Sequence, residues 1–291
     1  HRYYGVSIAQ HIAQHLPEVT ADSTLAPFYN PHSLNSLQSD LLGKLSAAQS
    51  TQGGWPWIEG FAPDRYTTLL ILKGIGEMET MGCTAIATND TLYTMVKRGL
   101  AYLDHTYHEQ YEQMRHKPKQ LNSYALYYLY VRSMFPELPF GDIPTTAYHH
   151  YRQLLSKGKA TQGTLMQKAL KMLTLIRMGE HDQASRIAEV VNQSSLNSDE
   201  MGTYWRDNRY AYSWDSNPIA TQALLIEAFV HLGQPSEIIG RMQQWLLKQK
   251  QTTHWDNTLA TAQAVHALIS PSGQSSLSGS NAIKVKVGSR G

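Results

Sequence analysis

The chain is organised around residues 202–230, where a polar aromatic stretch, Gly202-Thr-Tyr-Trp-Arg-Asp-Asn-Arg-Tyr-Ala-Tyr-Ser-Trp-Asp-Ser-Asn217, runs directly into Pro218-Ile-Ala-Thr-Gln-Ala-Leu-Leu-Ile-Glu-Ala-Phe-Val230. The first part has the composition of a loop, and the second part predicts a buried helix. Gly53-Gly-Trp-Pro-Trp57 leads in the same way into an apolar run over 69–75, and His254-Trp-Asp-Asn257 leads into 259–268. An aromatic loop followed by a buried helix is therefore a repeated unit of this sequence.

Apolar periodicity predicts helices along most of the chain. The predicted helices cover residues 3–16, 34–49, 69–78, 92–103, 121–134, 143–155, 165–178, 184–191, 219–232, 238–245 and 259–268. Segments that are apolar on most sides alternate with segments that carry one apolar stripe, and helices of the first kind belong in an interior that helices of the second kind cover. We therefore expect an all-α fold, an α/α toroid of about six helix hairpins with an inner and an outer ring. A superhelical stack of helix pairs would share the two-helix period.

The composition changes after residue 270. Residues 271–281 are rich in Ser and Gly, and Ala282-Ile-Lys-Val-Lys-Val287 alternates apolar and cationic residues as a β-strand does. We expect a toroid over residues 1–270, and a linker and strand over 271–291 that return to an adjacent β domain of a longer parent protein. A chain that opens at His1 without Met fits such a fragment.

Charge and cysteine content exclude several classes of function. A formal net charge of +2 argues against a nucleic-acid binder, which would carry a basic stripe. No apolar run approaches the roughly 18 residues that a membrane span requires, so no membrane insertion is expected. A single cysteine excludes an internal disulfide framework and a multi-cysteine zinc site. We find no motif for a metal or another cofactor.

The polar residues at the starts of the buried helices have two interpretations. Asn217, with Pro218 at the first helical position, and Asp64 are suited to cap helices. In a toroid, however, the loops that enter the inner helices gather at one end, where they would form a candidate binding surface for a sugar, a prenyl chain or a protein. The candidate residues of this surface are Trp55, Trp57, Asp64, Arg65, Tyr204, Trp205, Asp207, Trp214, Asp215 and Trp255.

Three blocks of sequence carry a family resemblance. They are Gln52-Gly-Gly-Trp-Pro-Trp57 with Asp64-Arg-Tyr-Thr-Thr-Leu-Leu-Ile-Leu-Lys-Gly-Ile-Gly76, then Tyr204-Trp-Arg-Asp-Asn208 with the helix after Pro218, and finally Trp255-Asp-Asn-Thr-Leu-Ala-Thr-Ala-Gln-Ala-Val265. In this order they resemble the thioester-domain region of bacterial α2-macroglobulin-like proteins, in particular those of Bacteroides-type bacteria. Gln49-Ser-Thr-Gln-Gly-Gly-Trp55 is also similar to the Gln/Trp motif by which terpene cyclases tighten helix ends on an α/α barrel.

The resemblance implies a helical toroid within a large secreted or periplasmic protein that traps proteases. Its partners would be target proteases and the neighbouring β domains of the same parent chain. In members that carry a thioester, a Cys-x-Glu-Gln segment forms it between the Cys sulfur and the Gln acyl carbon. Cys83 is followed by Thr84, Ala85 and Ile86 and cannot close such a ring, so no residue of this chain is assigned a catalytic role.

Two other classes of function stay open from the sequence. One is an α/α toroid enzyme acting on glycans or isoprenoids, in which Asp207, Asp215 and Asp64 would be the candidate carboxylates of a glycosidase pair. The sequence lacks an Asp-x-Asp-Asp motif for protonating an isoprenoid. The other is a scaffold whose toroid binds a peptide. We expect a non-enzymatic domain.

Overall fold

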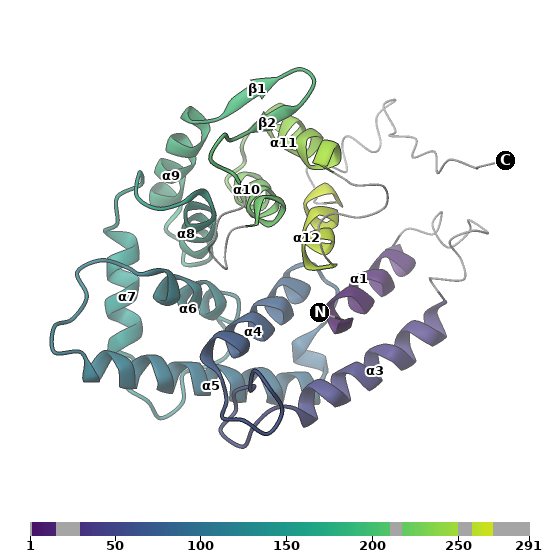
Figure 1. Ribbon diagram of the computed structural model, residues 1–291, viewed down its shortest axis with the longest axis vertical. Helices are drawn as coiled ribbons and strands as arrows, with labels where there is room; N and C mark the ends of the chain where they lie inside the picture. The colour runs from purple at the N-terminus through teal and green to yellow at the C-terminus, as the bar shows by residue number, and fades with distance from the viewer. Residues whose placement is uncertain (1, 16–29, 210–216, 250–257, 270–291) are drawn as a thin grey trace. The chain divides into compact units, whose positions relative to one another are not determined.

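The computed structural model describes residues 2–15, 30–209, 217–249 and 258–269. Its regular structure is almost entirely helical, with a single two-stranded sheet, so the predicted all-α class is confirmed (Figure 1). The strand predicted at 282–287 lies outside the described residues, as do Trp214, Asp215 and Trp255. The elements in chain order are α1 (Arg2–His15), α3 (Pro31–Ala47), α4 (Arg65–Thr80), the 3-10 helix η2 (Ile86–Thr88), α5 (Asp90–Gln113), α6 (Ser123–Ser133), α7 (Thr146–Ser156), α8 (Leu165–Arg177), α9 (His181–Gln193), β1 (Leu196–Ser198), β2 (Gly202–Tyr204), α10 (Pro218–His231), α11 (Ser236–Gln249) and α12 (Thr258–Ile269).

The chain divides into two compact units, His1–Ala184 and Ser185–Gly291. The boundary falls within α9. The first unit therefore holds α1 to α8, and the second holds β1, β2 and α10 to α12.

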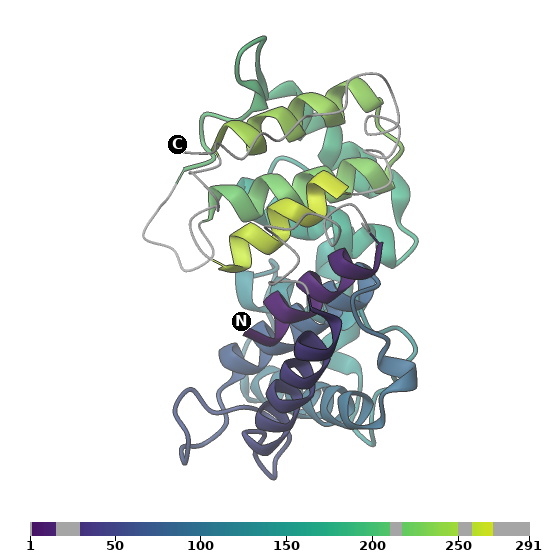
Figure 2. The ribbon, with the colours of Figure 1, turned by 90° about the vertical axis from the view of Figure 1, so that its right-hand side faces the viewer.

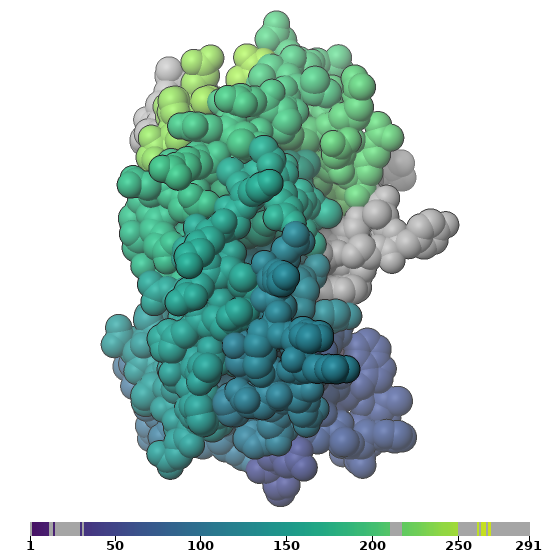
Figure 3. All heavy atoms as spheres, turned by 90° about the vertical axis from the view of Figure 1, so that its left-hand side faces the viewer, coloured from purple at the N-terminus to yellow at the C-terminus, as the bar shows by residue number. Residues whose placement is uncertain are grey.

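The first unit consists of two helix layers. In one layer α1 contacts α4, α4 contacts α6, and α6 contacts α8, while in the other α3 contacts α5 and α5 contacts α7. Helices α1 and α3 lie side by side across the layers (Figures 1 and 2), and Figure 3 views the unit from the side on which α7 lies. Elements that alternate in sequence thus become neighbours within one layer.

Burial separates the two layers. In α6, every residue from Ala125 to Arg132 is buried, whereas in α7 only Ala147, Tyr151 and Leu155 are buried, each four positions from the next. Such a single stripe faces one neighbouring layer, and a helix buried on all sides needs neighbours around it. The burial patterns of α6 and α7 match the alternation that the sequence predicts.

The second unit surrounds α10, in which every residue from Pro218 to Phe229 is buried. Helices α11 and α12 both contact α10, and β2 packs on α11. Strand β2 pairs antiparallel with β1, Asn197 opposite Thr203. The sequence predicts a loop from Gly202 onward, because strands of three residues are too short to display a period-two pattern.

The loops that precede α4 and α10 bond to the preceding helix in the same way. The indole N–H of Trp55 donates to the carbonyl oxygen of Leu45 (2.9 Å), and that of Trp205 donates to the carbonyl oxygen of Val191 (2.7 Å). Each acceptor lies two residues before the end of its helix, α3 or α9, where carbonyl groups have no partner within the helix. The ring of Trp55 also rests on Gly99 of α5, where an added Cβ would lie 2.9 Å from the indole Cζ3.

In each of these loops a glycine lies against the backbone of a helix with a single buried stripe, α5 or α11. Gly53 has φ +95°, and an added Cβ would lie 2.4 Å from the carbonyl oxygen of Arg98 in α5. Gly202 has φ +76°, and an added Cβ would lie 2.1 Å from the carbonyl oxygen of Arg241 in α11. Both positions therefore require glycine for conformation and for space.

A buried glutamine amide fastens each loop to the same helix. Gln49 Nε2 donates to the carbonyl oxygens of Gly53 (2.7 Å) and of Met95 in α5 (2.9 Å). Gln222, which comes from α10 and not from the loop, makes the equivalent pair of bonds to the carbonyl oxygens of Thr203 (2.9 Å) and Met242 (3.2 Å). Side-chain bonds to backbone carbonyl oxygens thus fasten each aromatic loop to the helix before it and to α5 or α11.

We expect Gly53→Ala and Gly202→Ala each to lower the free energy of unfolding by about 3 kcal/mol or more, since overpacking adds to the cost of a positive φ. Gly60→Ala is the matched control, because Gly60 has φ +85° but no atom within 4 Å of an added Cβ. It should cost only about 1–2 kcal/mol. Urea denaturation measures the three values, and equal losses at Gly53 and Gly60 would contradict the close approach to Arg98.

Candidate functional site

Two of the predicted surface tryptophans are buried. Trp55 is 1% exposed and Trp205 is 4% exposed, and the indole N–H of each is bonded to a helix end. Their rings have no free face on which a sugar or prenyl chain could stack. Within their loops both side chains act in packing.

Trp57, by contrast, lies on an exposed apolar loop together with two residues that the sequence analysis did not select. Trp57 is 70% exposed, Ile58 56% and Phe61 69%. A backbone bridge between Pro56 and Pro63 closes the base of this loop, and Phe61 N donates to the carbonyl oxygen of Ile58 (3.1 Å). Clustered exposed apolar side chains typically mark a surface that another molecule covers. Their sequence signal is three large apolar residues between Pro56 and Pro63, interrupted by Glu59 and Gly60.

Asp64 caps α4, as the sequence predicts. Its Oδ1 accepts bonds from the backbone N (2.7 Å) and the hydroxyl (2.8 Å) of Thr67. In the second unit, Asn217 caps α10 by accepting from Ile219 N and Ala220 N, both at 3.0 Å. These bonds give both residues a local structural role.

Arg65, the first residue of α4, is directed into a layer of tyrosines. Its guanidinium lies 5.3 Å from the ring centroid of Tyr107 and 5.1 Å from that of Tyr124, and it donates to Gln110 Oε1. Tyr107 stacks on Tyr128 with centroids 4.3 Å apart. Burial raises the pKa of Tyr107, and the nearby Arg65 partly opposes that shift. Arg65 therefore joins α4 to α5 and α6 through cation–π contacts.

Of the predicted site residues of the second unit, the structure describes Tyr204, Trp205 and Asp207. Tyr204 is half-buried in β2, opposite Leu196, and Asp207 is exposed in the turn that follows Trp205. The remaining predicted residues of this unit lie outside the described ranges.

An interior charge pair was not foreseen from the sequence. Asp104 Oδ1 accepts a bond from the Tyr128 hydroxyl (2.7 Å) and lies 3.5 Å from Arg132 Nε. Burial raises the pKa of Asp104, while Arg132 and Tyr128 act in the opposite direction. The guanidinium of Arg132 also lies 4.0 Å from the ring centroid of Phe140. Both charged side chains are about 97% buried, so we interpret the pair as part of the core.

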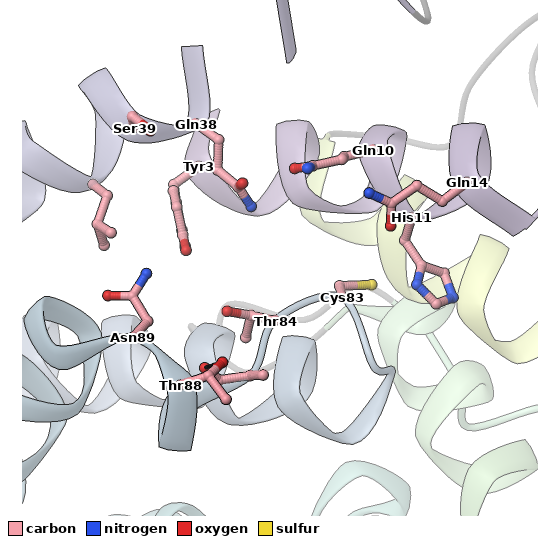
Figure 4. A pocket seen from close by; sticks show the side chains of 12 residues that line it. Tyr3, Gln10, His11, Gln14, Gln38, Ser39, Cys83, Thr84, Thr88 and Asn89 are labelled. Atoms are coloured by element: carbon pink, nitrogen blue, oxygen red, sulfur yellow. Dashed lines mark hydrogen bonds between the residues drawn. The ribbon is translucent and has the colours of Figure 1, made fainter. Parts of the chain in front are cut away.

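Cys83 lies on a small pocket of the first unit, about 250 Å³ in volume. Figure 4 shows side chains of α1 and α3 on one side of the pocket and of the segment 83–89 on the other. The backbone of Cys83 follows α4, with its N donating to the carbonyl oxygen of Met78 (2.8 Å). Burial raises the pKa of the Cys83 thiol to about 11, so the reactive thiolate is scarce at neutral pH.

The described residues hold neither a metal-binding cluster nor a membrane-spanning helix. These residues include no group of three or more His, Cys, Asp or Glu side chains placed to hold a metal ion. Nor does any helix that the structure describes have the length and apolar character needed to cross a membrane.

Comparison with known proteins gave no match, neither to a protein-family model nor to a curated protein.

Because burial raises the pKa of the Cys83 thiol to about 11, we expect alkylation by iodoacetamide at pH 8 to be about a hundredfold slower in the native chain than in urea. The native rate should rise with pH up to about 11. Mass spectrometry of quenched samples follows the reaction. Equal rates in the two states would show that the thiol is not desolvated.

Proposed function

We propose that this chain is a non-catalytic α/α toroid domain of a large bacterial α2-macroglobulin-like protein, which traps proteases in the periplasm or at the cell surface. The three sequence blocks around Trp55, Trp205 and Trp255 suggest the family. Within that protein the domain would act by contact with neighbouring β domains and not by chemistry of its own.

The observation that carries a contact function is the exposed loop of Trp57, Ile58 and Phe61. Large apolar and aromatic side chains contribute most of the binding energy at many protein interfaces. The loop is closed at its base by the Pro56–Pro63 bridge, and Asp64 N donates to the carbonyl oxygen of Trp55 (2.9 Å). A loop held in this way loses little conformational entropy on binding.

The two helix layers of the first unit support the toroid. Helix α6 is buried on all sides and contacts α4 and α8, while α5 contacts α3 and α7 in the covering layer. In the second unit α10 has the same all-round burial and α11 the same single stripe. An α/α toroid is built by continuing such an alternation around a closed ring.

The described carboxylates favour this proposal over a glycosidase. Asp64 is engaged by Thr67 as a helix cap, and Asp207 is exposed in the turn that follows Trp205. A glycosidase requires two carboxyl groups facing one bond. The bonding of Asp64 gives it a sufficient structural role without catalysis.

A closed toroid predicts a compact particle in solution. For 291 residues the radius of gyration should be about 19 Å. The superhelical alternative is elongated and would give a larger radius with an asymmetric distance distribution. Small-angle X-ray scattering on the monomeric chain measures both quantities, and the elongated profile would refute the toroid.

The trapping function is tested with the full-length parent protein and a broad-specificity endopeptidase. We expect the parent to slow digestion of casein far more than hydrolysis of a small peptide substrate, because a trap excludes large substrates by size. Trp57→Ser combined with Phe61→Ser should weaken this inhibition if the loop docks a neighbouring domain.

Tyr93→Ser is the control for that experiment, since Tyr93 is 39% exposed in the same unit but lies on α5. Undiminished casein digestion with the wild-type parent would refute protease trapping. Normal inhibition by the loop variant would refute the docking role of the loop but not protease trapping.

A further inference from the structure

A cavity of the first unit lies between the segments that lead into α6 and α8. It is formed mainly by residues 119–123 and 157–163, with side chains from the end of α7 and the start of α8, and has a volume of about 730 Å³. Small-molecule sites typically measure about 300–1,000 Å³. The cavity lies wholly within one unit and includes none of the predicted site residues.

The charged side chains that line this cavity are all positive. Four lysines line it, namely Lys119, Lys157, Lys159 and Lys171, and none of its lining residues is Asp or Glu. In the part of the chain that the structure describes, no carboxylate lies within ion-pairing distance of these four ammonium groups. Like charges that lack counter-charges raise the local potential and attract an anion.

Lys171 is the most enclosed of the four. It is half-buried, and its Nζ donates to the carbonyl oxygen of Gln162 (2.8 Å), which fixes the ammonium at the wall of the cavity. Desolvation, followed by repulsion from Lys168, lowers the pKa of Lys171. A bound anion would relieve both effects, because it supplies the missing counter-charge.

Two helices begin at this cavity. Asn122 and Ser123, at the start of α6, and Gln167, in the first turn of α8, contribute to its lining. The positive ends of both helix dipoles therefore add to the lysine charges. Cap side chains satisfy Ala125 N and Gln167 N, so the helix starts are ordered without a ligand.

Hydrogen bonds join the two walls. Gln167 Nε2 donates to Ser123 Oγ (2.8 Å), and Gln162 Nε2 donates to Gln120 Oε1 (3.2 Å). These contacts connect the entry to α6 with the entry to α8. A preformed cavity costs little ordering entropy when a ligand enters.

The remaining lining includes leucines. They are Leu121, Leu126, Leu154 and Leu155, of which Leu126 and Leu155 are buried. An inorganic ion would leave this apolar surface and most of the volume unused. The lining therefore suits a ligand with an anionic group and an uncharged body.

We propose that this lysine-lined cavity binds a small organic phosphate ester, with the phosphate held by the lysines and the helix starts and the organic body against the leucines. A dianionic phosphate monoester fits four ammonium groups without a carboxylate partner better than a monoanionic sulfate monoester does. This binding activity is independent of protease trapping, and its failure would leave the proposed family role untouched.

The test is isothermal titration of the 291-residue chain with phenyl phosphate, phenyl sulfate, inorganic phosphate and phenol at low ionic strength. We expect phenyl phosphate to bind at least tenfold more tightly than each of the other three. Its affinity should fall when the salt concentration rises, because salt screens the lysine charges. Absence of binding by phenyl phosphate at millimolar concentration would overturn the proposal, as would equal binding by phenol.

Charge-matched variants locate the site. Lys157→Gln with Lys159→Gln should weaken phenyl phosphate at least tenfold, and both side chains are exposed, so the fold should be retained. Lys44→Gln with Lys97→Gln removes the same charge from exposed positions outside the cavity and should change the affinity less than twofold. An equal loss of affinity in the two double variants would show that only the net charge of the chain matters. It would overturn the assignment of the site to this cavity.

Lysine footprinting gives a second readout that does not depend on variants. Bound phenyl phosphate should slow acetylation of Lys119, Lys157 and Lys159 and leave Lys44 unaffected, as followed by peptide mass spectrometry. Uniform rates at all four positions would refute binding in this cavity. If anionic lipid vesicles slow acetylation of these lysines and phenyl phosphate does not, the lysines bind a membrane surface. That result would also refute the proposed phosphate ester site.

Discussion

The structure depends on how the carbonyl groups at the ends of α3 and α9 obtain hydrogen bonds. The last carbonyls of a helix have no partner within it, and an unbonded buried carbonyl costs about 1–3 kcal/mol. In both units an indole N–H supplies a bond, from Trp55 to Leu45 and from Trp205 to Val191, whose carbonyl oxygen also accepts from Ser194 N and Oγ. Each tryptophan precedes a buried helix, and the starts of those helices, α4 and α10, are capped by Asp64 and Asn217.

The same constraint divides the aromatic residues into separate roles. The indole of Trp55 is bonded inside the protein, while Trp57, two residues later, is exposed. Tyr107 and Tyr128 stack between α5 and α6, where Arg65 covers the edge of the layer. Similar side chains thus stabilise helix ends, fill an interhelical layer or face solvent, according to which polar atoms surround them.

Local signals in the sequence located the helices and two of their caps, Asp64 and Asn217. The periodicity over 165–178 corresponds to α8, Leu165–Arg177, and Asn217-Pro218 marks the start of α10. The prediction for α5 was too short, since the helix continues to Gln113 with Tyr107 and Tyr111 in its stripe in place of aliphatic residues. Aromatic stripes on a polar helix give a weak periodic signal.

The cavity and the close glycine contacts could not be predicted from the sequence, because they form between segments that are distant along the chain. Lys119 and Lys171 line one cavity only because α6 and α8 begin side by side. Likewise, the sequence identifies Gly53 as a turn residue but not its approach to Arg98. The burial of Trp55 follows from a bond to Leu45, so composition alone could not distinguish it from the exposed Trp57.

The contact between Trp55 and Gly99 makes two positions dependent on each other. While the indole occupies its place, a side chain at residue 99 has no room on that face of α5. A smaller residue at position 55 would vacate that room but would leave the carbonyl oxygen of Leu45 without its donor. Substitutions at the two positions are therefore non-additive. Over evolutionary time, descendants of this chain should retain the pair together or replace it together.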